Sequence, residues 1–179
     1  TIADPAELVD PSPSVDDLRQ TVRHWFEPDE LHRRLQADGH HAVQLAVDWL
    51  SRSGKRWRPL LTASAYAALR GGADLASASV VQTAAVAVEC FHKASLIHDD
   101  IEDGDFVRYG LETFHKQHGV PIALNAGDLL IGEGYRLLAE SATDDAIRVK
   151  MLGAVSLAHR RLCIGQGEEL RWMRHPDAP

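Results

Sequence analysis

The sequence predicts an all-α fold, and three observations support this. Apolar residues recur at intervals of three and four, no segment alternates between apolar and polar residues, and capping or breaking residues separate the segments. Of the 179 residues, 45% are hydrophobic, which is enough for one substantial buried core. We therefore expect a single helical domain over residues 14–179, preceded by a proline-containing extended lead-in over residues 1–13.

The first part of the chain predicts three helices, over residues 14–36, 41–52 and 59–70. Ser14 and Asp17 form the capping-box pattern that starts a helix. Gly54 follows the end of the second helix, and Pro59 suits the first turn of the third. The pair Gly71–Gly72 is expected to end that third helix.

The second part predicts a long buried helix over residues 76–103, a short one over 111–118, another long one over 121–141, and a last one that begins near residue 143. No helix breaker interrupts the first of these, and apolar side chains follow its length at helical spacing. Gly104 and Gly110 bracket a loop, and Gly119 separates the short helix from the next long one.

Composition excludes several classes of protein. A formal net charge of -7 argues against a nucleic-acid partner, which needs a basic face. No apolar run approaches the roughly 18 to 20 residues of a membrane span, and the start of the chain lacks a signal-peptide pattern, so we expect a protein that does not span a membrane. Only Cys90 and Cys163 are present, without a CxxC pair, which favours a reducing cytoplasm.

An acidic cluster ends the long buried helix. Asp99 and Asp103 are four residues apart, so their carboxylates leave the same helix face, and Asp100 lies about 100° round. An acidic string is commonly just a solvated helix end. Carboxylates at a helix C-terminus oppose the helix dipole, however, and such a set of hard oxygen ligands suits Mg²⁺. The cluster is therefore a candidate magnesium site.

A basic segment, Gly54-Lys-Arg-Trp-Arg-Pro59, precedes the third helix. Three cations beside a helix N-terminus favour a phosphate group, although such a loop alone is more often solvated surface. His92 lies seven residues before Asp99, and nearly two helical turns place both on one face. We therefore expect a phosphate-binding site near the carboxylates, formed by the basic segment and His92.

Several segments together resemble the trans-isoprenyl diphosphate synthase family. They are, in order, Gly54-Lys-Arg-Trp-Arg-Pro59, His92-Lys-Ala-Ser-Leu-Ile-His-Asp-Asp-Ile-Glu-Asp103, Arg108-Tyr-Gly-Leu-Glu-Thr-Phe-His115, Ala126-Gly-Asp128 and Gly165-Gln166. The resemblance covers about residues 51–170. It implies an isoprenoid synthase helical bundle, incomplete at its C-terminus, and a homodimer.

The resemblance also implies roles for individual residues. Mg²⁺, held by Asp99, Asp100 and Asp103, would assist departure of the diphosphate of an allylic substrate, which Arg108 also binds. The resulting allylic cation is then attacked by isopentenyl diphosphate, which gives a longer trans-polyprenyl diphosphate. The acceptor site would comprise Lys55, Arg58 and His92, with Arg56 a weaker candidate, and Gln166 would line the diphosphate cavity.

The resemblance also implies that the side chains four and five residues before the aspartates floor the pocket and set product length. These are Ser95 and Ala94, both too small to block elongation. Phe91 lies about one turn deeper, roughly 5 to 6 Å along the helix axis. We therefore expect Phe91 to floor the pocket and the product to be near C20.

Two departures from the family pattern leave alternatives open. Tyr109 stands where the family usually has a second arginine, which weakens the predicted acceptor site. The chain also stops before the Lys-Thr segment and the second aspartate-rich motif, so we expect a fragment of a longer polypeptide. The alternatives are a terpene cyclase of related fold that uses one allylic diphosphate, and a non-catalytic partner subunit of a prenyl synthase.

Overall fold

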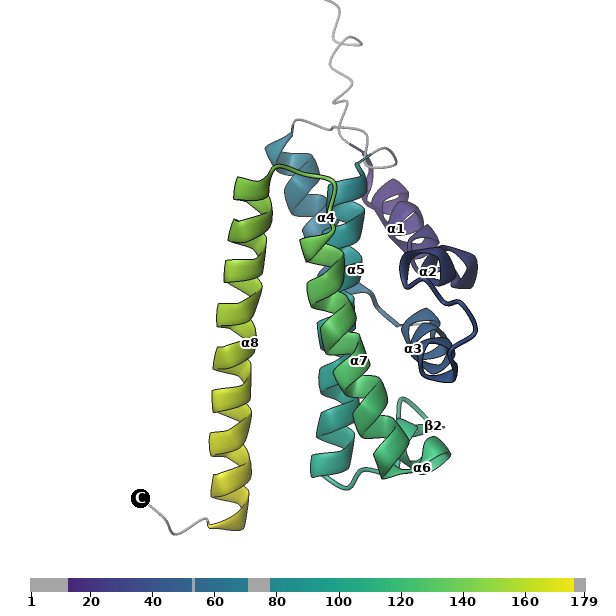
Figure 1. Ribbon diagram of the computed structural model, residues 1–179, viewed down its shortest axis with the longest axis vertical. Coiled ribbons are helices and arrows are strands. Elements are labelled where there is room, and N and C mark those ends of the chain that lie inside the picture. Colours follow the sequence, from purple (N-terminus) through teal and green to yellow (C-terminus); the bar gives the residue numbers. More distant parts are fainter. Residues whose placement is uncertain (1–12, 53, 71–77, 176–179) are drawn as a thin grey trace, which may run out of the picture.

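The computed structural model describes residues 13–52, 54–70 and 78–175, and these form a helical bundle, as predicted (Figure 1). The helices are α1 (Val15–His24), α2 (Pro28–Arg34), α3 (His41–Ser51), α4 (Trp57–Leu69), α5 (Ser79–Glu102), α6 (Phe114–His118), α7 (Val120–Ala139) and α8 (Asp145–Arg174). The two short strands are β1 (Val107–Arg108) and β2 (Leu111–Glu112). Nearly all of the predicted lead-in and the pair Gly71–Gly72 lie outside the described residues.

The first predicted helix is two helices rather than one. α1 begins as expected with a reciprocal capping box, in which the backbone N–H groups of Ser14 and Asp17 each donate to the other's side chain at 3.1 Å. The helix ends before Pro28, which opens α2, because proline lacks an N–H and its ring clashes with the preceding turn. Trp25 and Phe26, between the two helices, are buried in the core.

α3 matches its prediction, whereas α4 begins two residues earlier than expected. Its first residue is Trp57, so Pro59 lies inside the first turn, where its missing N–H has no cost. Arg56 precedes the helix in a left-handed conformation, with φ of 47°. This sharp turn directs the basic segment back toward α5.

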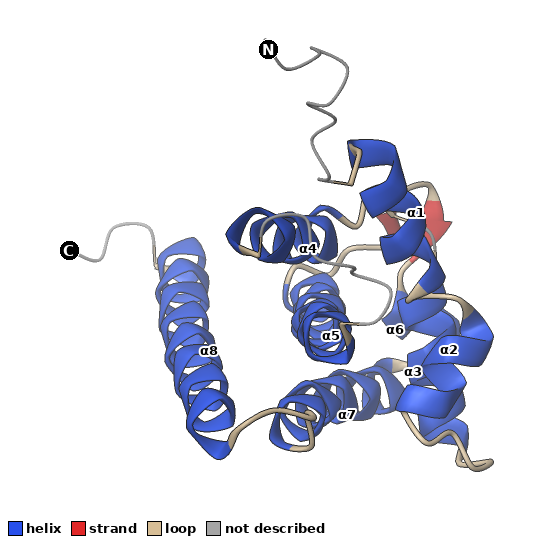
Figure 2. Cartoon of the chain, turned by 90° about the horizontal axis from the view of Figure 1, so that it is seen from above, coloured by secondary structure: helices blue, strands red, loops and turns tan. Residues whose placement is uncertain are grey.

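α5 lies at the centre of the bundle, and its most extensive packing is against α7 (Figure 2). Two glycines of α7, seven residues apart, make the close approach possible. A Cβ added to Gly127 would lie 2.3 Å from Nε2 of His98, and one added to Gly134 would lie 2.6 Å from Cζ of Phe91. Because each glycine lacks a side chain, a ring of α5 packs directly against the α7 backbone there, His98 at Gly127 and Phe91 at Gly134.

A β-hairpin takes the place of the first turn of the short helix predicted from Leu111. The strands pair antiparallel, with Arg108 opposite Leu111. Tyr109 and Gly110 connect them with φ of 54° and 81°, the positive values that a two-residue type I′ turn requires. The helix therefore begins only at Phe114, where α6 starts.

α8 contrasts with α5. It runs alongside the bundle, and none of its described residues is buried (Figure 1). Large apolar side chains along it are exposed, from 47% at Leu157 to 69% at Trp172, with Leu162 and Ile164 between these values. α8 therefore contributes surface rather than core.

α5 is also long and apolar enough to count as a candidate membrane span by length and composition, alone among the helices of the described segments. Of its most apolar window, 56% is buried inside the bundle. The core helix of a helical bundle has this property.

Candidate functional site

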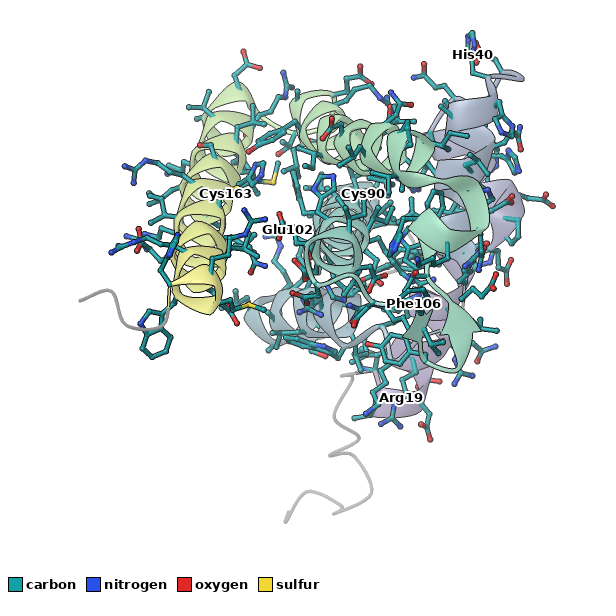
Figure 3. All side chains as sticks on the ribbon, turned by 90° about the horizontal axis from the view of Figure 1, so that it is seen from below. Arg19, His40, Cys90, Glu102, Phe106 and Cys163 are labelled. Carbon is teal, nitrogen blue, oxygen red and sulfur yellow. The ribbon has the colours of Figure 1, made fainter. Side chains whose placement is uncertain are left out.

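A cavity of about 520 Å³ separates α5 from α8. Arg58 of α4 and Ile131 of α7 complete its walls. Figure 3 labels Glu102 of α5 and Cys163 of α8, which line it from opposite sides. Six of the predicted site residues line it as well, namely Arg58, Phe91, His92, Ser95, Asp99 and Gln166.

The predicted aspartates do not share one environment. Asp99 lines the cavity, and Asp103 caps α5 and is exposed. Burial raises the pKa of Asp99, and the negative charges of Glu102 and Asp103 raise it further. A cation beside Asp99 would relieve this repulsion.

Asp100 is fully buried and pairs with an arginine instead of lining the cavity. The Nε of Arg108, on β1, donates to Oδ1 of Asp100 at 2.6 Å, while Oδ2 has no hydrogen-bond partner among the described residues. Burial raises the pKa of Asp100 in spite of this hydrogen bond. The pair therefore anchors the hairpin against the end of α5.

The donor set fits Mg²⁺ in part. In the described segments, no three His, Cys, Asp or Glu side chains are grouped closely enough to hold a metal ion. Asp99 and Asp103 offer accessible carboxylate oxygens, which Mg²⁺ prefers. Asp100, predicted as a third ligand, has one oxygen committed to Arg108 and does not fit in this conformation. The residues that would hold the ion are therefore Asp99 and Asp103.

Arg58 and His92 form a hydrogen-bonded pair on the wall of the cavity. Nη1 of Arg58 donates to Nε2 of His92 at 2.9 Å. Because arginine has no acceptor, Nε2 of His92 must carry the lone pair and Nδ1 the hydrogen. Burial, followed by the positive charges of nearby cations, lowers the pKa of His92 to about 4. The imidazole is therefore neutral at pH 7.

Arg56, predicted as a weaker substrate-binding candidate, forms an ion pair and hydrogen bonds within the protein. Its Nη1 donates to Glu89 at 2.8 Å, and its Nη2 donates to the backbone carbonyls of Leu50 and Arg52. The guanidinium also lies 4.2 Å from the ring centroid of Phe26. These contacts use three of the five N–H donors of the guanidinium within the protein. Lys55, in contrast, is exposed.

The opposite end of the cavity is walled by aromatic rings. Phe91 meets Tyr135 of α7 edge to face, with ring centroids 5.0 Å apart. The hydroxyl of Tyr135 is hydrogen-bonded to Nδ1 of His159, on α8, at 3.0 Å. Ser95 lines the cavity beside Phe91, whereas Ala94, also predicted there, is fully buried. A shift of one residue turns a helical side chain by about 100°, which takes Ala94 away from the cavity.

α8 supplies several cavity residues that the sequence analysis did not single out, as do α5, with Val88 and His98, and α7, with Ile131. His159, Cys163 and Leu170 line the cavity with Gln166, whose Nε2 donates to Oε2 of Glu102 at 3.0 Å. Their spacing of three and four residues places them on one helix face. That stripe is the only signal in the sequence that could have identified them.

Comparisons with known proteins agree with this architecture. Residues 40–179 match the model of the family described as polyprenyl synthetase. The chain is 33% identical over 138 residues to a geranylgeranyl pyrophosphate synthase of Geoglobus acetivorans, covering 77% of this chain and 41% of the relative. It is 37% identical over 117 residues to a geranylgeranyl diphosphate synthase of Mycobacterium tuberculosis, covering 65% of this chain and 32% of the relative.

The fold is also similar to that of a solved structure. The geranylgeranyl pyrophosphate synthetase of Geoglobus acetivorans superposes with a TM-score of 0.74 at 26% sequence identity, over 87% of this chain and 49% of that one. The chain thus spans half or less of the length of these relatives. The motifs, the helical bundle and the match over residues 40–179 establish that the chain belongs to the trans-isoprenyl diphosphate synthase, or polyprenyl synthetase, family.

Proposed function

We propose that the chain provides the substrate-ionising part of a prenyltransferase that condenses isopentenyl diphosphate with an allylic diphosphate. The products would be a longer trans-polyprenyl diphosphate, near C20, and diphosphate. The observation that carries the proposal is a single cavity with Asp99 at one end and aromatic rings at the other. Such a cavity suits a substrate with a charged head and an apolar tail. Relatives named geranylgeranyl diphosphate synthase support the product size.

We assign separate sets of residues to the allylic diphosphate and to the acceptor diphosphate. Mg²⁺, when bound, would stabilise the charge that develops on the leaving diphosphate, and Asp99 and Asp103 would hold it. We assign Arg108 to the allylic diphosphate, in a position that its hydrogen bond to Asp100 fixes. The acceptor diphosphate is assigned to Arg58 and His92, which line the cavity, together with the exposed Lys55.

The apolar end of the cavity would set product length. The ring of Phe91 packs against the backbone at Gly134 and against the ring of Tyr135. These contacts restrict its rotation to another rotamer. The hydroxyl of Tyr135 is hydrogen-bonded to His159, which fixes the ring that packs on Phe91. We infer that a growing apolar chain stops when it reaches Phe91.

The test is a product assay on the complete polypeptide with Mg²⁺, an allylic diphosphate and isopentenyl diphosphate. Elongated diphosphates that form only when the acceptor is present are the expected result. Hydrocarbon or alcohol from the allylic substrate alone would reject the proposal in favour of a terpene cyclase. Substrate binding without turnover would reject it in favour of a partner subunit.

We also propose that the complete protein is a homodimer, as is usual in the family. Sedimentation equilibrium across a range of concentrations would measure this, and a monomer at every concentration would contradict it.

A further inference from the structure

The cavity between α5 and α8 continues beyond Phe91. Val88, three residues before Phe91 on α5, also lines it. At the rise of an α-helix, Val88 lies about 4.5 Å further than Phe91 from Asp99 along the helix axis. An apolar part of the cavity therefore lies behind the ring of Phe91, and we call it the rear of the cavity.

α8 lines the rear of the cavity from the opposite side. It runs in the same direction as α5, because His159 contacts Phe91 and, further along both helices, Gln166 contacts Glu102. Val155, four residues before His159, lines the cavity as well. It lies about 6 Å further back along α8, so it belongs to the rear of the cavity.

The rings of Phe91 and His159 form a constriction between the rear of the cavity and the aspartate end. Their centroids lie 6.2 Å apart, at an interplanar angle of 46°. Rings with centroids about 4.5 to 7 Å apart are in contact, so an isoprenoid chain cannot pass between them. Tyr135 contacts both, because its ring meets Phe91 edge to face and its hydroxyl is hydrogen-bonded to Nδ1 of His159 at 3.0 Å. Tyr135 therefore holds the constriction in place.

We propose that His159 is a specificity-determining residue, which closes the cavity together with Phe91 and so limits the length of the product. This inference rests on the proposed function and deepens it. The imidazole contacts the end of the growing chain from α8, and Tyr135 is a positioning residue that acts through it. None of the described residues of α8 is buried, so replacing His159 changes the cavity and leaves the core intact.

The test is calorimetric titration of the complete polypeptide with thiolodiphosphate analogues of C20 and C25 prenyl chains in the presence of Mg²⁺. The carbon–sulfur bond of these analogues resists ionisation, so binding is measured without turnover. The unchanged polypeptide should bind the C20 analogue more tightly. In His159→Ala, the last isoprene unit of the C25 analogue enters the rear of the cavity. This analogue should then bind at least about tenfold more tightly than it binds to the unchanged polypeptide.

Other variants at the constriction sharpen the test. His159→Phe keeps a ring at this position and should retain the preference for the C20 analogue. Val155→Phe, added to His159→Ala, fills the rear of the cavity and should abolish the tighter binding of the C25 analogue. Leu157→Ala is the matched control, since Leu157 is 47% exposed on α8 and does not line the cavity. It should leave the binding of both analogues unchanged. Equal affinity of the unchanged polypeptide and His159→Ala for the C25 analogue would overturn the inference.

The product assay separates this inference from the proposed function. Acceptor-dependent elongation with the same product distribution in the unchanged polypeptide and in His159→Ala would reject only the role of His159. Tighter binding of the C25 analogue by His159→Ala in a polypeptide that forms no elongated product would keep the constriction and reject prenyl transfer.

Discussion

The two faces of α5 differ in burial and in how their charges are paired, although residues of the two faces are neighbours in the sequence. Asp99 and Ser95 face the cavity, whereas their neighbours Asp100 and Ala94 are fully buried. On the buried side, charge is neutralised within the protein, as between Asp100 and Arg108. On the cavity side, charge is left accessible. One helix therefore carries both a structural face and a binding face.

The two neighbouring helices match this division. α7 approaches α5 closely because Gly127 and Gly134 leave gaps for rings of α5. α8 buries none of its described residues and leaves a cavity instead. Substitutions on the α7 side should therefore change stability, and substitutions on the cavity side should change what the protein binds or makes.

Breaking the buried ion pair should have the largest effect on stability. Arg108→Leu leaves the fully buried carboxyl of Asp100 without its partner, so the carboxyl must either stay charged at a high cost or take up a proton. Removing one member of a buried pair costs about 3 kcal/mol in the free energy of unfolding. Urea denaturation would measure the change, and a loss well under 1 kcal/mol would show that the two faces of α5 do not differ as described.

Arg19→Leu provides the comparison for this prediction. Arg19 pairs with Asp16 at 3.0 Å, but both side chains are more than half exposed. An exposed pair contributes about 0 to 1 kcal/mol, so this variant should unfold at nearly the same urea concentration as the unchanged protein.

Filling a glycine gap should have the next largest effect. In Gly134→Ala, the new Cβ would lie 2.6 Å from Cζ of Phe91, so the ring or the helix must move. Overpacking of this kind costs about 1 to 3 kcal/mol. The melting temperature should fall, and near-ultraviolet circular dichroism should report a changed aromatic environment.

Gly153→Ala on α8 is the matched control and should have a small effect of opposite sign. A Cβ added to Gly153 meets nothing within 4 Å. Alanine in place of glycine inside a helix stabilises it by about 0.5 to 1 kcal/mol. A lower melting temperature for this variant would contradict the open packing of α8.

The sequence was sufficient for features that depend on local pattern. The long buried helix ending at the aspartates follows from helical periodicity, and the capping box at Ser14 and Asp17 follows from spacing alone. The segments that resemble the family also located Asp99, His92 and Arg58 on one cavity. These features need no knowledge of how the helices pack.

Other features depend on partners far along the chain. In the sequence, nothing near Arg56 indicates an ion-pair partner. Its partner, Glu89, lies 33 residues later and comes close only when the helices pack. The hairpin at Tyr109 has strands of two residues, too short to show an alternating pattern. The cavity wall formed by His159 and Gln166 appears only once α8 is set against α5.

The central claim is that the cavity between α5 and α8 holds the growing isoprenoid chain, with Phe91 as its floor. The most direct measurement is the product distribution of Phe91→Ala in the complete enzyme, compared with that of the unchanged enzyme under the same conditions. Removal of the ring opens the apolar end of the cavity, so the account predicts longer polyprenyl diphosphates. An unchanged product distribution in a folded, active variant would contradict it.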